Sequence, residues 1–281
     1  DDGLNEATPS RGDWGGIWAG HLGQLNLDHA YIAFGGGDDN KIEGTFKGFN
    51  VIEIHQADAR IANSVIEQNA RGTGGQGPAA RFGRGPNDGA TIFVRGAQPV
   101  ILNNIIRDND DVAITINIDA LTGQPLSDPG RATGVIDQVT LYRDNRGPLV
   151  RGDRLANNGV GLASTVGTNG MEVRTAAIGT AGTLTTVGIT LSTDSVWDDT
   201  DIVHILYDEV RIPDLHVYGG LRLQSSPNES LVVKMYGPGA LNDAYNRNAT
   251  TGAGFTATGR RLETEDRIGG TLYVVSVARD D

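Results

Sequence analysis

Apolar and polar residues alternate over short stretches in the first half of the chain, and each stretch ends on asparagine, aspartate or glycine. The pattern Ile-x-Asn-x-x-Ile-x-x-Asn occurs at 61–69 and again at 101–109. A looser copy at 150–159 places Asp153, Leu155 and Asn158 in the same frame. Alternation of this kind predicts short β-strands, and the polar residues that follow predict turns.

A strand of this length cannot bury its apolar face alone, whereas stacked copies can. We therefore predict an all-β fold, a single right-handed parallel β-helix (solenoid) with long loop excursions. The apolar positions expected to stack are spaced by 34, 40 and 49 residues: Ile32, Ile66, Ile106 and Leu155. A bare coil needs about 20–25 residues, so the surplus is expected to leave the stack as loops.

The asparagines of the pattern are expected to stack as well. We predict Asn63 over Asn103 and Asn69 over Asn109, with their side chains satisfying backbone groups of the turns. The glycine-rich and proline-rich segments 70–89, 121–134, 157–170 and 242–266 are the predicted excursions.

Domain organisation has two interpretations. In the first, residues 1–12 are a loose N-terminal segment and residues 13–281 form the β-helix. In the second, the β-helix covers 13–182 and a separate β domain covers 183–281, because the asparagine pattern is lost in the second half. Trp14, which precedes two glycines, is expected to plug the open end of the stack or to begin its first strand.

Charge and composition narrow the class of partner. The net charge of −12 disfavours nucleic acid, whose phosphates an acidic protein repels. No apolar stretch of 18 residues occurs, so we predict no membrane span. The chain has 40 glycines, which suits an all-β protein with many turns, and it has no cysteine. These features fit an extracellular or cell-surface location.

Several segments occur together in the order of one known module. They are GDWGGI (12–17), ATIFVRGAQPVILNN (90–104), DPGRATG (128–134), DNRGPLVRG (144–152), SVWDDTDIVHIL (195–206), GGLRLQSS (219–226), ESLVVK (229–234), GFTATGR (254–260) and DRIGGTL (266–272). This set resembles the right-handed parallel β-helix modules of very large secreted bacterial proteins. The resemblance implies a tandem, surface-exposed module with a structural or adhesive role, and it brings no catalytic residues with it. Its ends, Asp1-Asp2-Gly3 and Arg279-Asp280-Asp281, look like junctions between modules.

Catalytic chemistry has weaker support in the sequence. Asp110-Asp111 is similar to the paired-aspartate strand of polygalacturonases, in which two carboxylates act as acid and base. The Gly-His-Gly and Arg-Ile-Lys segments of that family are missing downstream, so a turn carrying two acids is the plainer interpretation. Lyase chemistry would require a basic residue and calcium ligands. The candidates for these are Arg107, Arg143 and Arg151, and Asp108, Asp110 and Asp144.

The densest acidic cluster lies at 198–201. Asp198, Asp199 and Asp201 are oxygen ligands of the kind that Ca²⁺ prefers, and we predict a weak calcium site there. A turn that precedes the strand at 202–206 is the alternative interpretation. No other cofactor is expected.

The sequence thus favours a structural or adhesive module, with neighbouring modules or other subunits as end-to-end partners. A polysaccharide lyase or glycoside hydrolase of the pectin-degrading type remains the alternative, and in either case polysaccharide is a candidate ligand.

Overall fold

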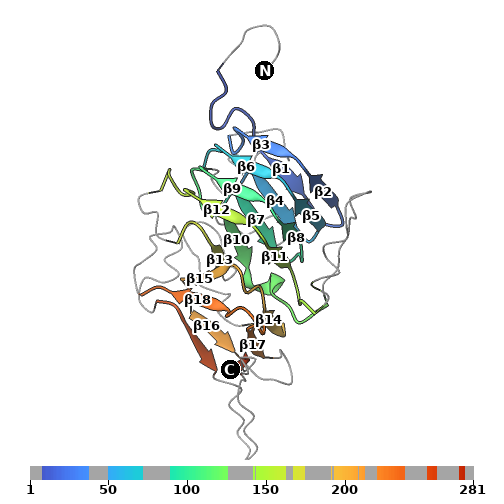
Figure 1. Cartoon of the computed structure of the whole chain (residues 1–281), viewed down its shortest axis with the longest axis vertical. Coiled ribbons are helices and arrows are strands. Elements are labelled where there is room, and N and C mark those ends of the chain that lie inside the picture. The colour runs from blue at the N-terminus through green and yellow to red at the C-terminus, as the bar shows by residue number, and fades with distance from the viewer. Residues whose placement is uncertain are drawn as a thin grey trace, which may run out of the picture.

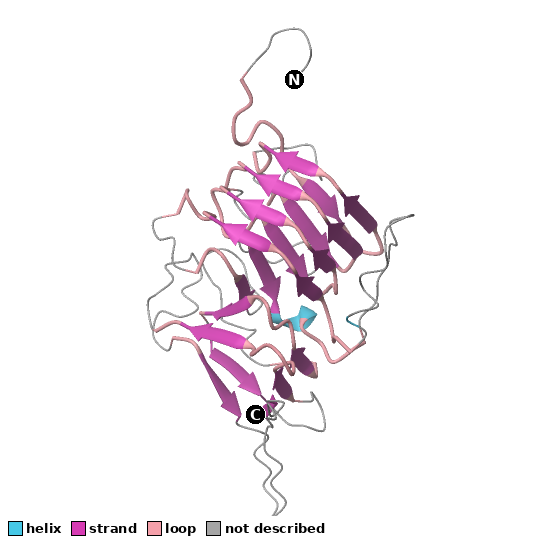
Figure 2. Ribbon diagram, in the orientation of Figure 1, coloured by secondary structure: helices cyan, strands magenta, loops and turns pink. Residues whose placement is uncertain are grey.

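Parallel β-strands make up almost all of the regular structure (Figure 2). The computed structural model describes residues 8–37, 50–71, 89–125, 142, 144–162, 167–174, 191, 193–207, 209–212, 220–237, 252–257 and 272–275. Within these residues helix is confined to the short 3₁₀ segment η1 (Ile118–Ala120) and to 3₁₀ conformation at Tyr142. Taken together, most residues of the four predicted loop segments lie outside the described part of the chain.

Three sheets organise the first half of the chain (Figure 1). Sheet A contains β1 (Ile17–Ala19), β4 (Ile52–His55), β7 (Ile92–Arg95), β10 (Ile114–Asn117), β13 (Met171–Arg174), β15 (Val203–Leu206) and β18 (Val232–Met235). Sheet B contains β2 (Gln24–Asp28), β5 (Asp58–Ala62), β8 (Val100–Leu102) and β11 (Leu149–Arg151). Sheet C contains β3 (Tyr31–Ala33), β6 (Val65–Glu67), β9 (Ile105–Arg107) and β12 (Arg154–Ala156).

The chain visits these sheets in a fixed cycle. It runs from sheet A to sheet B to sheet C, then returns to sheet A beside the strand it left before. We call each set of three strands a rung: β1–β3, β4–β6, β7–β9 and β10–β12. Neighbouring rungs pair parallel in all three sheets. This order is compatible with a β-solenoid.

The predicted register of the apolar positions is confirmed. In sheet C, Ile32 pairs with Ile66, Ile66 with Ile106, and Ile106 with Leu155. Ile66 and Ile106 are fully buried, and Ile32 is nearly so. Insertions of different length between rungs therefore leave the register unchanged, because a shift by one residue would turn the whole apolar set out of the core.

A second apolar ladder runs along sheet A. It comprises Ile17, Ile52, Ile92, Ile114 and Met171, each in register with the next. These side chains belong to the main core, together with the isoleucines of sheets B and C. The indole of Trp14 packs on the edge of this core, and its Nε1 donates to the Ala33 carbonyl at 2.7 Å.

Asn63 and Asn103 have a conformational role that the sequence pattern did not distinguish, and their predicted stacking stays a prediction. Both have positive φ, 51° and 57°, at the corner between sheets B and C, and Gly152 occupies the corner of the next rung with φ of 66°. Asparagine and glycine tolerate this left-handed conformation better than other residues do. The pattern thus reports a backbone turn at this corner. The Asn63 side chain also donates to Asp28 Oδ1 of the first rung at 2.9 Å, and the residue that follows each corner makes the further inter-rung contacts described below.

Sheet A continues into the second half of the chain, through β15 and β18. There the chain cycles through sheet A, then the pair β16 (Glu209–Ile212) and β19 (Gly254–Ala257), then sheet D. Sheet D contains β14 (Ser195–Trp197), β17 (Leu221–Gln224) and β20 (Leu272–Val275). Sheet A therefore contains strands from both sides of residues 182–183, the position at which the sequence allowed a domain boundary.

His204 interrupts the apolar ladder of sheet A. It pairs with Met171 on one side and Val233 on the other, is fully buried, and stacks on the Trp197 indole with ring centroids 5.4 Å apart. The backbone of Ile202 favours the protonated form of the His204 ring, whereas burial opposes it. Neither ring nitrogen has a hydrogen-bond partner. Burial lowers the pKa of His204 to about 4.

We expect His204 to make the protein acid-sensitive. A histidine whose folded pKa lies below its unfolded value contributes stability above the unfolded pKa, and loses it as pH falls towards the folded pKa. Relative to His204→Leu, the wild-type protein should lose about 2–3 kcal/mol of unfolding free energy between pH 7.5 and 4.5. Urea denaturation of both proteins at the two pH values measures this difference.

The comparison with His204→Leu is needed because Asp198 acts in the opposite direction. Burial raises the pKa of Asp198 to about 6, so protonation near pH 6 relieves a penalty that the folded state carries at neutral pH. An equal pH dependence in the wild-type protein and in His204→Leu would show that His204 is not neutral and buried.

Candidate functional site

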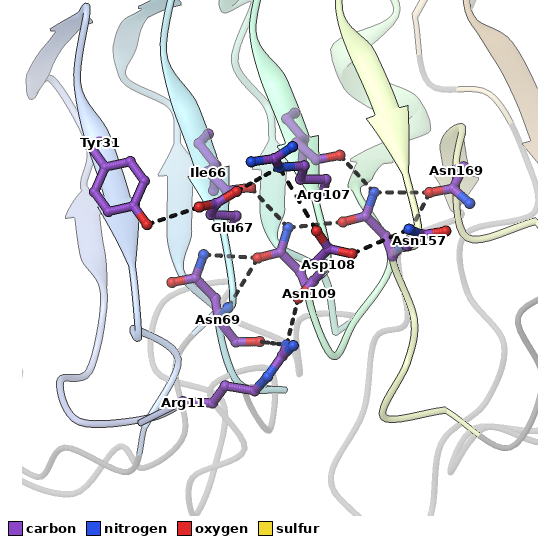
Figure 3. A network of polar contacts seen from close by, with 12 residues as sticks. Arg11, Tyr31, Ile66, Glu67, Asn69, Arg107, Asp108, Asn109, Asn157 and Asn169 are labelled. Atoms are coloured by element: carbon purple, nitrogen blue, oxygen red, sulfur yellow. Dashed lines mark hydrogen bonds and ion pairs between the residues drawn. The ribbon is translucent and has the colours of Figure 1, made fainter. Parts of the chain in front are cut away.

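A continuous ladder of asparagines crosses the rungs beyond sheet C, with Asn69, Asn109 and Asn158 buried and Asn169 exposed (Figure 3). The Asn69 amide donates to Asn109 Oδ1 at 2.8 Å, Asn109 donates to Asn158 Oδ1 at 2.8 Å, and Asn158 donates to Asn169 Oδ1 at 2.9 Å. Asn109 also donates to the Ile66 carbonyl at 3.1 Å and accepts from the Asn69 backbone N–H at 3.1 Å. The predicted stacking of Asn69 over Asn109 is thus confirmed, and these side chains do satisfy turn backbone groups.

A second polar ladder lies at the corner between sheets B and C. Asn104 Oδ1 accepts from the Ser64 backbone N–H at 3.0 Å, and Asp153 Oδ1 accepts from both the backbone and the side-chain N–H of Asn104, at 2.7 and 2.9 Å. Burial raises the pKa of Asp153 well above the usual range for a carboxyl group. The ladder therefore ends on a carboxyl group that is costly to ionise.

Charged side chains connect the rungs on the outer face of sheet C (Figure 3). Glu67 accepts from Arg107 Nε at 2.6 Å and from the Tyr31 hydroxyl at 2.8 Å. The Arg107 guanidinium lowers the pKa of Glu67. Arg11 Nη1 donates to the Asp108 carbonyl at 2.6 Å and lies 3.0 Å from Asp110 Oδ1. Part of the segment predicted to be loose is therefore held against the third rung.

The paired aspartates at 110–111 do not share one site. Asp110 pairs with Arg11, whereas Asp111 is 3% exposed and accepts from the Val112 backbone N–H at 2.8 Å. Arg71 Nε lies 3.6 Å from the other oxygen of Asp111. The two carboxylates therefore each have a local cationic partner and lie in different surroundings.

The acidic cluster at 198–201 covers the open edge of sheet B. Asp199 Oδ1 accepts from the Val150 backbone N–H at 2.9 Å, and Asp201 Oδ2 accepts from the Gly152 N–H at 2.7 Å. Asp198 Oδ2 accepts from the Arg146 N–H at 2.9 Å. Strand β11 is the last strand of sheet B, so its edge-facing amides would otherwise lack acceptors. The three carboxylates accept from three different amides along and beside this strand, those of Arg146, Val150 and Gly152.

This arrangement predicts that two substitutions at Asp199 differ in their effect on the stability of the protein. Its carboxyl is 1% exposed, and burial raises its pKa well above the usual range. Asp199→Asn keeps an oxygen for the Val150 N–H and removes a buried charge, so at pH 8 we expect it to melt no lower than the wild-type protein. Asp199→Ala leaves that N–H without an acceptor and should cost about 1–3 kcal/mol. Thermal melts of the three proteins in a chelating buffer measure these effects.

Calcium binding at Asp198, Asp199 and Asp201 stays a prediction. Within the described residues, no group of three or more histidine, aspartate or glutamate side chains is arranged to hold a metal ion. Repeating the melts at millimolar calcium decides the matter. A midpoint that rises in the wild-type protein and not in Asp199→Asn or Asp201→Asn would establish the site. An unchanged wild-type midpoint would leave the cluster as an edge cap alone.

One cleft of the described surface brings together groups that are distant in the sequence. It has a volume of about 310 Å³ and is lined by Tyr142, Asp144, Asn145, Arg151, Asp198 and the segment 224–227. Two of the residues that the sequence associated with lyase chemistry, Asp144 and Arg151, meet here. Arg107, Asp108 and Asp110 lie instead at sheet C and the turn after it, and Arg143 lies outside the described residues.

Arg151 fixes one wall of this cleft. Its two terminal nitrogens donate to Glu229 Oε2 at 2.7 and 2.8 Å, and Nη2 donates to Thr200 Oγ1 at 2.8 Å. Its guanidinium carbon lies 5.2 Å from the centroid of the Tyr142 ring. A guanidinium engaged by Glu229 and Thr200 is held in one orientation, so Arg151 acts as a positioning group.

Sequence reasoning did not identify Tyr142 or the segment 224–227 as site residues. No motif marks them, because the cleft forms where separate turns of the chain meet. The sequence did name three residues of the cleft, Asp144 and Arg151 as lyase candidates and Asp198 in the acidic cluster.

Comparisons of this chain with protein-family models, with curated proteins and with solved structures found no match. Among the described residues there is no helix of the length and apolar character needed to cross a membrane.

Proposed function

We propose that the chain is a right-handed parallel β-helix module with a structural or adhesive role in a larger extracellular bacterial protein. The cyclic order of the strands, their parallel pairing and the asparagine ladder support a closed coil. The resemblance of its segments to modules of very large secreted proteins supports the tandem arrangement and the location.

The observation that carries this proposal is the pair of open edges at the ends of sheet A. Strands β1 and β18 each pair on one side only within the described residues. The first rung is also less buried than the second: Ile17 and Leu27 are only partly buried, whereas Ile52 and Ile61, with which they pair, are inaccessible. Unpaired parallel edges of this kind accept a further rung from a neighbouring module or a second subunit.

A polysaccharide lyase or glycoside hydrolase is the second candidate, and the cleft at Arg151 is the observation that favours it. Against it stand the engagement of Arg151 with Glu229 and the separate partners of Asp110 and Asp111. Fold alone is weak support for catalysis, because function depends on the site.

Sedimentation of the isolated chain over a range of concentrations tests the structural role. We expect concentration-dependent association that Tyr31→Lys weakens, because a lysine on the exposed edge of the first rung opposes strand pairing. The control is Val160→Lys, at a position that is 55% exposed and outside the strands.

A chain that stays monomeric at all concentrations would contradict end-to-end assembly. Turnover of an acidic polysaccharide by the wild-type chain, abolished in Asp144→Asn at the cleft, would replace the structural proposal with the enzymatic one.

A further inference from the structure

The cleft beside Arg151 combines a flat apolar wall with several polar groups that lack partners. Tyr142 is partly buried against the small cluster formed by Ala62, Val100, Leu102 and Leu149. Its ring and Pro227 border the cleft, and the Arg151 guanidinium near the ring helps to hold it in place. An aromatic ring fixed at the border of a cleft is a surface on which the C–H face of a sugar ring stacks.

The polar groups of the cleft are suited to hydroxyl ligands. The Gln224 amide and the Asp144 carboxylate make no hydrogen bond with the described part of the chain, and both line the cleft. The Ser225 hydroxyl oxygen accepts from the Leu231 N–H at 3.1 Å, which leaves its own O–H to donate. Asp198 Oδ1 is buried and has no hydrogen-bond partner. A sugar hydroxyl both donates and accepts, so it satisfies carboxylate, amide and hydroxyl groups at once.

The charge of the cleft selects among saccharides. The single guanidinium of Arg151 is shared between Glu229, at 2.7 Å, and Asp201, at 3.5 Å. Asp144 and Asp198 therefore face the cleft without a cationic side chain of their own at contact distance among the described residues. An anionic sugar such as a uronate would be repelled.

The size of the cleft limits the ligand further. A volume of about 310 Å³ lies at the lower end of the range of about 300–1,000 Å³ that small-molecule sites occupy. This volume suits one or two sugar rings rather than a long stretch of polysaccharide.

We propose that the cleft formed by Tyr142, Asp144, Asp198 and Gln224 binds a neutral pyranose unit, with the sugar ring on Tyr142 and its hydroxyls on the carboxylates and the amide. This site does not depend on how the module assembles, because its residues all belong to one chain. It would give the module a means of attachment to uncharged polysaccharide.

Saturation-transfer NMR on the full chain tests the proposal. The probes are the methyl glycosides of glucose, galactose and mannose, with digalacturonate as the anionic probe. We expect saturation transfer to at least one neutral glycoside, with weaker transfer to digalacturonate, which the carboxylates of the cleft repel. Tyr142→Ala and Gln224→Ala should each weaken binding at least five-fold.

Tyr31→Ala is the matched control, because it removes an exposed tyrosine on β3 and should leave binding unchanged. The proposal is overturned if no neutral glycoside receives saturation, or if Tyr142→Ala and Gln224→Ala, with unchanged melting midpoints, bind like the wild-type chain. Tighter binding of digalacturonate would also overturn it, since that would show that the Arg151 guanidinium, rather than the carboxylates, governs recognition in the cleft. Sedimentation reports separately on assembly, so the two proposals fail independently.

Discussion

Replacement of Ile106 by alanine is expected to lower the free energy of unfolding by about 2–5 kcal/mol. Ile106 is fully buried and lies between Ile66 and Leu155, in register with both. The loss of its side chain leaves a cavity that the stacked neighbours cannot fill, because backbone pairing holds the rungs at a fixed spacing of about 4.8 Å. Urea denaturation at neutral pH measures the change.

The matched control is Ile105→Ala, one residue earlier on β9. Ile105 is half-buried and points to the other face of the strand. Its truncation should therefore cost clearly less than that of Ile106. Equal losses at both positions would contradict the assignment of Ile106 to the core ladder.

Replacement of Asn109 by alanine is expected to cost about 3–5 kcal/mol, because buried groups are left without partners on both sides of one rung. The Asn69 side-chain and backbone N–H groups lose their shared acceptor, and Asn158 Oδ1 and the Ile66 carbonyl lose a donor. All of this lies in a region closed to solvent, so water does not replace the lost bonds. Chemical denaturation again measures the loss.

Asn26→Ala provides the comparison for this substitution. Asn26 lies on β2, is exposed, and makes no hydrogen bond through its side chain within the described residues. We expect its truncation to change the unfolding free energy by about 0.5 kcal/mol or less. A loss at Asn109 as small as that at Asn26 would show that the asparagine ladder does not stabilise the stack.

The stacking of Ile66 over Ile106 and of Asn69 over Asn109 could be predicted because both depend on local repetition. Each copy of the pattern carries the strand, the corner and the polar group that the next rung needs. The separate role of Asn63 and Asn103 could not be read in the same way. A left-handed corner and a side-chain ladder both favour asparagine, and the sequence does not distinguish the two.

The second half of the chain shows where sequence reasoning ends. The carboxylates of Asp198, Asp199 and Asp201 were expected to converge on a cation, because they are close in sequence. In the structure they lie along the edge of β11, where each meets a different amide. Their direction depends on which strand ends sheet B, and that is a property of the whole stack. The cleft at Tyr142 was missed for the same reason.

The most direct test of the stacked arrangement is methyl NMR of protein labelled at its isoleucine δ1 positions. The register predicts cross-relaxation between the methyl groups of Ile32 and Ile66 and between those of Ile66 and Ile106. It predicts none between Ile32 and Ile106, which are two rungs, or about 9.6 Å, apart. Absence of the Ile66–Ile106 cross-peak, or a strong Ile32–Ile106 cross-peak, would contradict the stack of rungs on which every other inference depends.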